Sequence, residues 1–142
     1  MLPRLLYVGD VPVEASYHGS ALLYRLFQGY PAARLQIAEG NLLPPRTTRR
    51  LPDVRHTTFA VGRQRLLNTR FHDWYSRWLT ARAAGRAGRV RALLGGFSPE
   101  AIVTVGHGYS WVTAARLARE LEVPLHFVIH DDWPRVVSPR NE

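Results

Sequence analysis

The segment Ser98–Pro134 constrains the fold of this chain more than any other. It contains an apolar, β-branched run at 101–105, a Gly-His-Gly turn, an amphipathic stretch, and a second apolar run at 125–129 that ends in His-Asp-Asp. This order is typical of a strand, a helix and a second strand. Such units form parallel pairs with a right-handed crossover, so the turns that follow both strands lie at the same edge of the sheet. We therefore expect His107 and His130 to share one rim.

The N-terminal third of the chain repeats the same pattern. The apolar run Arg4–Val8 predicts a first buried strand, which Gly9 and Asp10 end. A helical spacing of leucines follows Ser16, the expected helix cap, and Arg34–Ala38 predicts a second strand. Strands that alternate with helices predict an α/β fold, here a Rossmann-like doubly wound parallel sheet.

The middle of the chain is less regular. The segment 39–55 carries three prolines and four arginines without a sustained period, which indicates a loop, and 56–61 is expected to form a short strand. A long helical pattern begins near Thr69, and Gly85 with Gly88 weakens it, so two helices are the alternative to one. Four aromatic residues fall on one face of this pattern and are expected to pack in the core: Phe71, Trp74, Tyr75 and Trp78.

Composition narrows the class of protein. A chain of 142 residues with 46% hydrophobic and 21% charged residues is expected to fold as one domain over residues 1–142. No apolar run reaches the roughly 18 residues that span a bilayer, and the N-terminus does not resemble a signal peptide, so we expect a cytoplasmic protein. Because the chain has no cysteine, disulfides, thiolate nucleophiles and cysteine-ligated zinc are excluded.

The net charge is +8, and all 19 basic residues are arginines. This charge favours anionic partners such as nucleotides, phosphorylated lipids or an acidic membrane surface, to which the chain could bind peripherally. No nucleic-acid-binding motif accompanies it, so we expect no nucleic-acid partner. The one dense cluster is expected to be a solvated loop, with a phosphate or lipid-headgroup site as the alternative: Arg46, Arg49, Arg50 and Arg55.

The predicted sheet places the candidate site at the carboxyl ends of its strands, where doubly wound sheets bind ligands. This rule selects three segments: Gly9–Ser20, Gly106–Ser110 and His130–Trp133. Helix N-termini near Tyr17 and Ser110 would offer unpaired N–H groups to a phosphate. Neither G-x-G-x-x-G after the first strand nor G-x-x-x-x-G-K-[ST] is present, which argues against a dinucleotide oxidoreductase and a P-loop enzyme.

The triplet His130-Asp131-Asp132 places one imidazole and two carboxylates side by side at the end of a predicted strand. Three roles remain open for it: acid/base contact with a substrate hydroxyl, metal ligation that would recruit His107, or capping of the next turn by one aspartate. His107 and Gly108 form either a tight turn with a solvated imidazole or a close approach to a ligand. His126, four residues before His130 on the same strand, lies about 13 Å away and is expected to be structural.

With these residues in view, the chain resembles the N-terminal domain of GT-B fold glycosyltransferases, particularly the family 4 type. The resemblance rests on RLLYVGD, on YHGSALLYRLF, and above all on FSPEAIVTVGHGYSWVTAARLARELEVPLHFVIHDDWP. It implies a nucleotide-diphosphate sugar donor, a sugar or lipid-linked acceptor, and chemistry commonly without an obligatory metal or other cofactor. By this resemblance His130 would be catalytic. The substrate-binding candidates at the rim are Asp10, His107, Gly108, Asp131 and Asp132.

The resemblance also implies that Gly19 and Ser20 lie near the donor phosphates. The chain departs from the family pattern here, because His18-Gly19-Ser20 replaces the usual Gly-Gly pair. The C-terminal, donor-binding domain of the family is absent from residues 1–142, so the chain is expected to be an acceptor-side half that folds but is inactive alone. Two alternatives remain: a non-enzymatic Rossmann-like binding or scaffold domain, and a metal-dependent hydrolase built on His107, His130 and the two aspartates.

Overall fold

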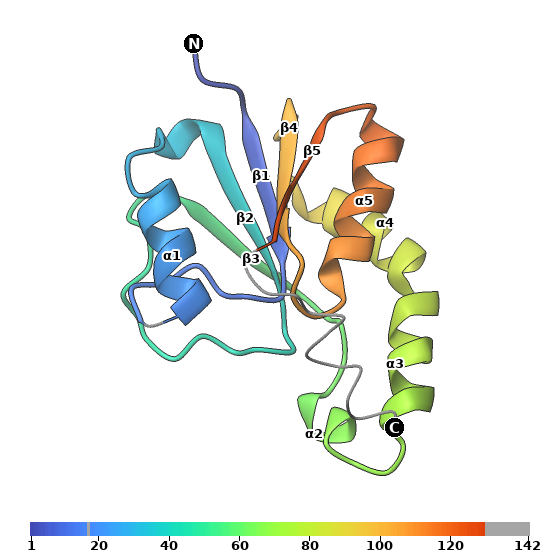
Figure 1. Ribbon diagram of the computed structural model, residues 1–142. Coiled ribbons are helices and arrows are strands. Elements are labelled where there is room, and N and C mark those ends of the chain that lie inside the picture. Colours follow the sequence, from blue (N-terminus) through green and yellow to red (C-terminus); the bar gives the residue numbers. More distant parts are fainter. Residues whose placement is uncertain (17, 130–142) are drawn as a thin grey trace.

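The computed structural model describes residues 1–16 and 18–129. The elements follow one another as β1 (Leu5–Gly9), α1 (His18–Phe27), a 3-10 turn η1 (Ala32–Arg34), β2 (Leu35–Gly40), β3 (Arg55–Phe59), α2 (Gln64–Leu67), α3 (His72–Ala81), α4 (Ala83–Leu93), β4 (Ala101–Val105), α5 (Ser110–Leu121) and β5 (Leu125–Val128) (Figure 1).

The described strands form one parallel sheet in the order β3-β2-β1-β4-β5. β1 lies at the centre, with Leu5 in register with Leu35 on one side and with Ala101 on the other. The chain fills the sheet outward from β1 through β2 and β3, then returns to the other side of β1 for β4 and β5. This arrangement confirms the predicted α/β, Rossmann-like doubly wound fold.

Helices cover both faces of the sheet (Figure 1). Alternate residues of β1 point to opposite faces, so Tyr7 packs beneath α1 and Leu6 packs toward α4 and α5. All five residues of β1 and all five of β4 are buried. Both strands are accordingly apolar along most of their length, as is typical of parallel strands that are buried on both faces.

The predicted strands agree with the observed ones to within a few residues. β2 continues to Gly40, so the irregular connection covers residues 41–54. The long helical pattern forms α3 and α4, which confirms the alternative of two helices. The break falls at Arg82, three residues before Gly85, so the glycines do not mark it.

The prediction that the aromatic stripe packs in the core is wrong for three of its four members. Tyr75 is buried, whereas Phe71, Trp74 and Trp78 are exposed. The cause is the position of α3, which extends past the carboxyl edge of the sheet, where no strand lies beneath it (Figure 1). Helical spacing identifies residues that share a face, but it does not show whether that face meets a partner.

Candidate functional site

The candidate site lies outside the carboxyl ends of β1 and β4, where the order in which strands are added to the sheet reverses. β1 is followed by Asp10, and β4 is followed by the turn Gly106–Tyr109 that leads into α5. Because β2 lies on one side of β1 and β4 on the other, the connections leave these two strands in opposite directions. Open parallel sheets bind ligands at this point.

Asp10 bridges this point. Its Oδ2 accepts hydrogen bonds from the N–H groups of Tyr109 at 2.6 Å and Ser110 at 2.8 Å, and its Oδ1 accepts one from the Ser110 hydroxyl at 2.6 Å. Asp10 therefore caps α5 from 100 residues away in sequence. The predicted cap, Ser110, is instead the first residue of the helix.

This cap corrects the prediction that the N-terminus of α5 offers unpaired N–H groups to a ligand phosphate. A buried carboxylate already occupies the N–H groups of Tyr109 and Ser110. Burial raises the pKa of Asp10, while the hydrogen bonds from Ser110 and Tyr109 partly offset that rise. Direct contact between Asp10 and a ligand stays a prediction, whereas its structural role is visible.

The position of the Asp10 carboxylate leaves no room for a side chain at residue 108. The φ of Gly108 is +76°, a left-handed value that favours glycine, and a Cβ at this position would collide with the Asp10 carboxylate. The close approach expected at Gly108 is therefore made to Asp10. The turn Gly106–Tyr109 holds His107 at the rim, and the His107 N–H donates to the Val105 carbonyl at 2.7 Å.

Two hollows flank His107. The larger, of about 490 Å³, is walled by the segment after β1, by the start of α1 and by the connection that follows β2. The smaller, of about 180 Å³, lies between that connection, α2, His72 and the turn Gly106–Tyr109. Both hollows are lined by His107, Leu43 and Gln64. His107 is thus the predicted site residue that is central to the described part of the rim.

The start of α1 contributes to the larger hollow. Gly19 and Ser20 line it together with His18, whose φ of +54° is unusual for a residue with a side chain. Arg46 lines the same hollow from the connection after β2. Gly19, Ser20 and His107 therefore line one hollow. Arg46 adds a positive charge to it, although the sequence analysis named Arg46 only as one member of the arginine cluster.

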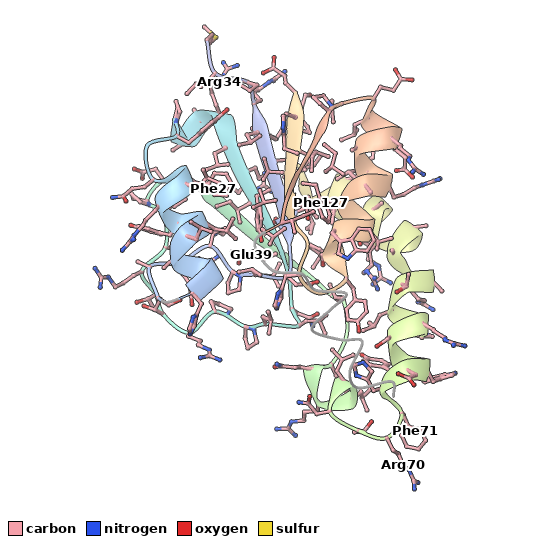
Figure 2. The ribbon with its side chains drawn as sticks, viewed as in Figure 1. Phe27, Arg34, Glu39, Arg70, Phe71 and Phe127 are labelled. Carbon is pink, nitrogen blue, oxygen red and sulfur yellow. The ribbon has the colours of Figure 1, made fainter. Side chains whose placement is uncertain are left out.

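Two buried glutamates hold in place the segment that contains Arg46. Glu14 accepts hydrogen bonds from the N–H groups of Arg46 at 3.0 Å and Thr47 at 3.2 Å. Glu39 accepts one from the Val13 N–H at 2.7 Å and pairs with the Arg50 guanidinium. Figure 2 labels Glu39 near the carboxyl edge of the sheet. These contacts attach the connection after β2 to the segment after β1.

The arginine cluster is accordingly not a uniformly solvated loop, as the sequence led us to expect. Arg50 is half-buried against Glu39, and the Arg55 guanidinium reaches the Leu94 carbonyl at 3.5 Å. Burial alone would raise the pKa of Glu39, but hydrogen bonds from His56, Arg50 and Val13 hold it below its ordinary value. Glu39 therefore remains ionised and keeps Arg50 in place.

Contacts of α3 with α2 and with the turn before α5 fix the far wall of the smaller hollow. The Tyr109 and Ser76 hydroxyls lie 2.6 Å apart, and His72 Nδ1 lies 2.7 Å from the Leu67 carbonyl. The sequence pattern did not point to His72 or Gln64 as site residues. Their placement depends on how α2 and α3 fold back over the rim, which no local motif encodes.

The triplet His130-Asp131-Asp132 lies outside the described residues, so its predicted roles stay predictions. His126, expected to be structural, is exposed on the edge strand β5. Among residues 1–16 and 18–129, no group of three or more histidine, aspartate or glutamate side chains could hold a metal ion. No helix in this part of the chain is long and apolar enough to cross a membrane.

Comparison of the chain with protein-family models, with curated proteins and with solved structures found no match. Function is therefore inferred from the fold, from the geometry of the rim and from the sequence resemblance.

Proposed function

We propose that this chain is the acceptor-side domain of a glycosyltransferase that moves a sugar from a nucleotide-diphosphate sugar to a sugar or lipid-linked acceptor. The observation that carries the proposal is the hollow of about 490 Å³, in which Gly19, Ser20, His107 and Arg46 meet. Its location outside the strand ends of a doubly wound parallel sheet supports ligand binding. The sequence resemblance to family 4 enzymes supports sugar transfer as the chemistry.

In this proposal, different residues of the rim contact different parts of the substrates. Gly19 and Ser20, at the start of α1, face the donor phosphates, because helix N-termini favour anions, and Arg46 adds positive charge. His107 lies between the two hollows, so it contacts the bound donor on one side and an acceptor hydroxyl on the other. His130 is assigned the catalytic role by the resemblance alone. In this proposal residues 1–142 supply the acceptor side of the site, and the test below measures ligand binding.

A second candidate is a non-enzymatic binding or scaffold domain. One observation favours it: three of the buried acidic side chains near the rim are used to hold the chain together. Asp10 caps α5, Glu14 binds the connection after β2, and Glu39 pairs with Arg50. A scaffold would need these contacts and no ligand.

Ligand-dependent thermal stability distinguishes the two candidates. At about 10 mM of a nucleoside-diphosphate sugar, a half-site with a dissociation constant of about 1 mM stabilises the fold by about 1.4 kcal/mol. For a domain of this size we expect the melting temperature to rise by about 2–5 °C with at least one donor of a panel. The unphosphorylated nucleoside is expected to have no effect.

Variants make the thermal measurement specific. His107→Ala is expected to abolish the rise, because His107 lines both hollows. The matched control is His126→Ala, which removes an exposed histidine from β5 and should leave the rise unchanged. No rise with any donor would favour the scaffold, and an equal rise in the His107→Ala variant would contradict the proposal because the donor would then bind away from His107.

A further inference from the structure

The net charge of the chain is concentrated in one segment. Residues 61–95, which contain α2, α3 and α4, carry eight arginines and a single acidic residue, Asp73. The formal charge of this segment is therefore +7, whereas the remaining residues together contribute +1 of the total of +8. Seven of these eight arginines are exposed, and the eighth, Arg86, is buried.

Large apolar side chains are exposed within the same segment. The exposed fractions are 40% for Leu66, 55% for Phe71, 68% for Trp74 and 37% for Trp78. We call these four residues, with Arg70 and Arg77 between them, the α2–α3 corner. Leu66, Phe71 and Trp74 line one open hollow together with Tyr75. Contiguous exposed apolar surface of this kind marks an interaction site.

The α2–α3 corner projects from the body of the domain. In Figure 1, α2 and the turn into α3 lie beyond the carboxyl edge of the sheet, and in Figure 2 the labelled Arg70 and Phe71 point away from the remainder of the molecule. The Arg70 guanidinium lies 5.0 Å from the centre of the Phe71 ring. Cations and aromatic rings therefore alternate along this projecting corner.

A larger hollow on the flank of the tip has the same character. It measures about 650 Å³, lies between α2, α3 and α4, and has no acidic residue in its lining. Arg63, Arg82 and Arg89 line it together with Trp74 and Trp78. The Arg82 guanidinium lies 5.2 Å from the centre of the Trp78 ring. The hollow thus offers positive charge beside an aromatic wall.

We infer that the α2–α3 corner docks on an anionic lipid bilayer. Tryptophan and phenylalanine prefer the boundary between headgroups and acyl chains, and exposed arginines are attracted to anionic headgroups. A second copy of the chain would bring two patches of the same charge together, which is unfavourable. A single-stranded nucleic acid would also bind arginines and aromatic rings, so the experiment below includes an oligonucleotide as the competing outcome.

Docking in this way brings the candidate site close to the membrane. Gln64 and Leu67 of α2 line the smaller hollow beside His107, so α2 belongs to both surfaces. The inference gives a location to the peripheral membrane binding that the net charge led us to expect, and its observations do not involve sugar transfer. It is tested without any nucleotide sugar, so either proposal can fail without the other.

The test is sedimentation of the full 142-residue chain with lipid vesicles. We expect binding to vesicles of phosphatidylcholine with about 30% phosphatidylglycerol and weak binding to phosphatidylcholine alone, because only the former is anionic. Binding is expected to weaken when salt is raised from about 0.1 M to about 0.5 M, since salt screens the charges of exposed arginines.

Two double variants test the two components of the surface. Phe71→Ser with Trp74→Ser is expected to weaken vesicle binding at least about tenfold, because both side chains would lose their burial in lipid. Arg70→Gln with Arg77→Gln is expected to weaken it by roughly 20-fold or more. All four side chains are exposed, so both variants should keep the circular dichroism spectrum and melting temperature of the parent.

Matched controls remove the same types of residue elsewhere. Leu22→Ser with Leu26→Ser removes exposed apolar side chains from α1, and Arg25→Gln with Arg119→Gln removes two exposed charges. If these controls reduce binding as much as the corner variants do, the surface is assigned wrongly. No binding to either vesicle would overturn the inference, and so would binding that requires no anionic lipid. Binding of an oligouridylate without vesicle binding would assign the corner to nucleic acid instead.

Discussion

Replacing Asp10 by alanine is expected to destabilise the chain by about 3–4 kcal/mol, measured by urea unfolding near pH 7. The Asp10 carboxylate is 1% exposed and accepts three hydrogen bonds from Tyr109 and Ser110. Without it, two backbone N–H groups and one hydroxyl lose their partners at the start of α5. The free-energy cost of leaving these three groups unpaired is expected to exceed the free energy gained by removing one buried charge.

Two further variants isolate the cap as the cause. Asp10→Asn keeps the volume and one acceptor oxygen, so its loss of stability is expected to be smaller, about 1–2 kcal/mol. Asp73→Ala removes an exposed carboxylate from the first turn of α3 and should cost less than about 1 kcal/mol. If Asp10→Ala were no more harmful than Asp73→Ala, the carboxylate would not hold β1 and α5 together.

Replacing Glu39 by glutamine is expected to destabilise the chain by about 3 kcal/mol near pH 7, because it breaks a largely buried ion pair with Arg50. The substitution keeps one acceptor oxygen for the Val13 N–H, so the expected loss is assigned to the ion pair. The control is Glu120→Gln, which breaks the exposed pair with Arg116 and should change stability by less than about 0.5 kcal/mol.

The pH dependence of the Glu39 effect has a defined sign. Hydrogen bonds from His56, Arg50 and Val13 outweigh burial, so the pKa of Glu39 in the folded chain lies below its ordinary value of 4.5. Its stabilising contribution is therefore complete above pH 4.5 and is lost as the pH falls through the folded value. The difference between parent and Glu39→Gln should shrink on acidification. A difference that stays constant down to pH 2 would show that Glu39 does not stabilise through its charge.

The strands of this fold could be predicted because each central strand is an apolar run closed by a glycine or a polar residue. The alternation of strand and helix then predicts the parallel sheet and its rim. The rim position of His107 follows from the same reasoning, because it comes directly after β4. Gly19, Ser20 and His107 are brought into one hollow, as that reasoning implies.

The remainder of the site depends on contacts between residues far apart in sequence. Asp10 and its partner Ser110 are 100 residues apart, and the Glu14 and Glu39 contacts span 32 and 26 residues. A carboxylate after a strand is as compatible with ligand binding as with capping. Only the three-dimensional arrangement shows that these three side chains face backbone N–H groups.

The α2–α3 corner shows why helical periodicity does not predict burial. The spacing of Phe71, Trp74 and Trp78 is the same for a core face and for an exposed face, so periodicity alone led to the wrong prediction. A signal was nevertheless present in the sequence, because residues 61–95 carry eight arginines and one acidic residue. Aromatic residues embedded in so high a density of one charge favour a surface over a core.

The most direct test of the proposed function is the map of amide chemical shifts when a nucleoside-diphosphate sugar is added to the ¹⁵N-labelled chain. The proposal predicts that the largest changes, saturating in the millimolar range, occur at Gly19, Ser20, His107 and Gly108. These residues surround the rim beside α1 and β4. If no amide responds, or if the changes lie away from this rim, then the rim does not bind nucleotide sugars and the proposal is wrong.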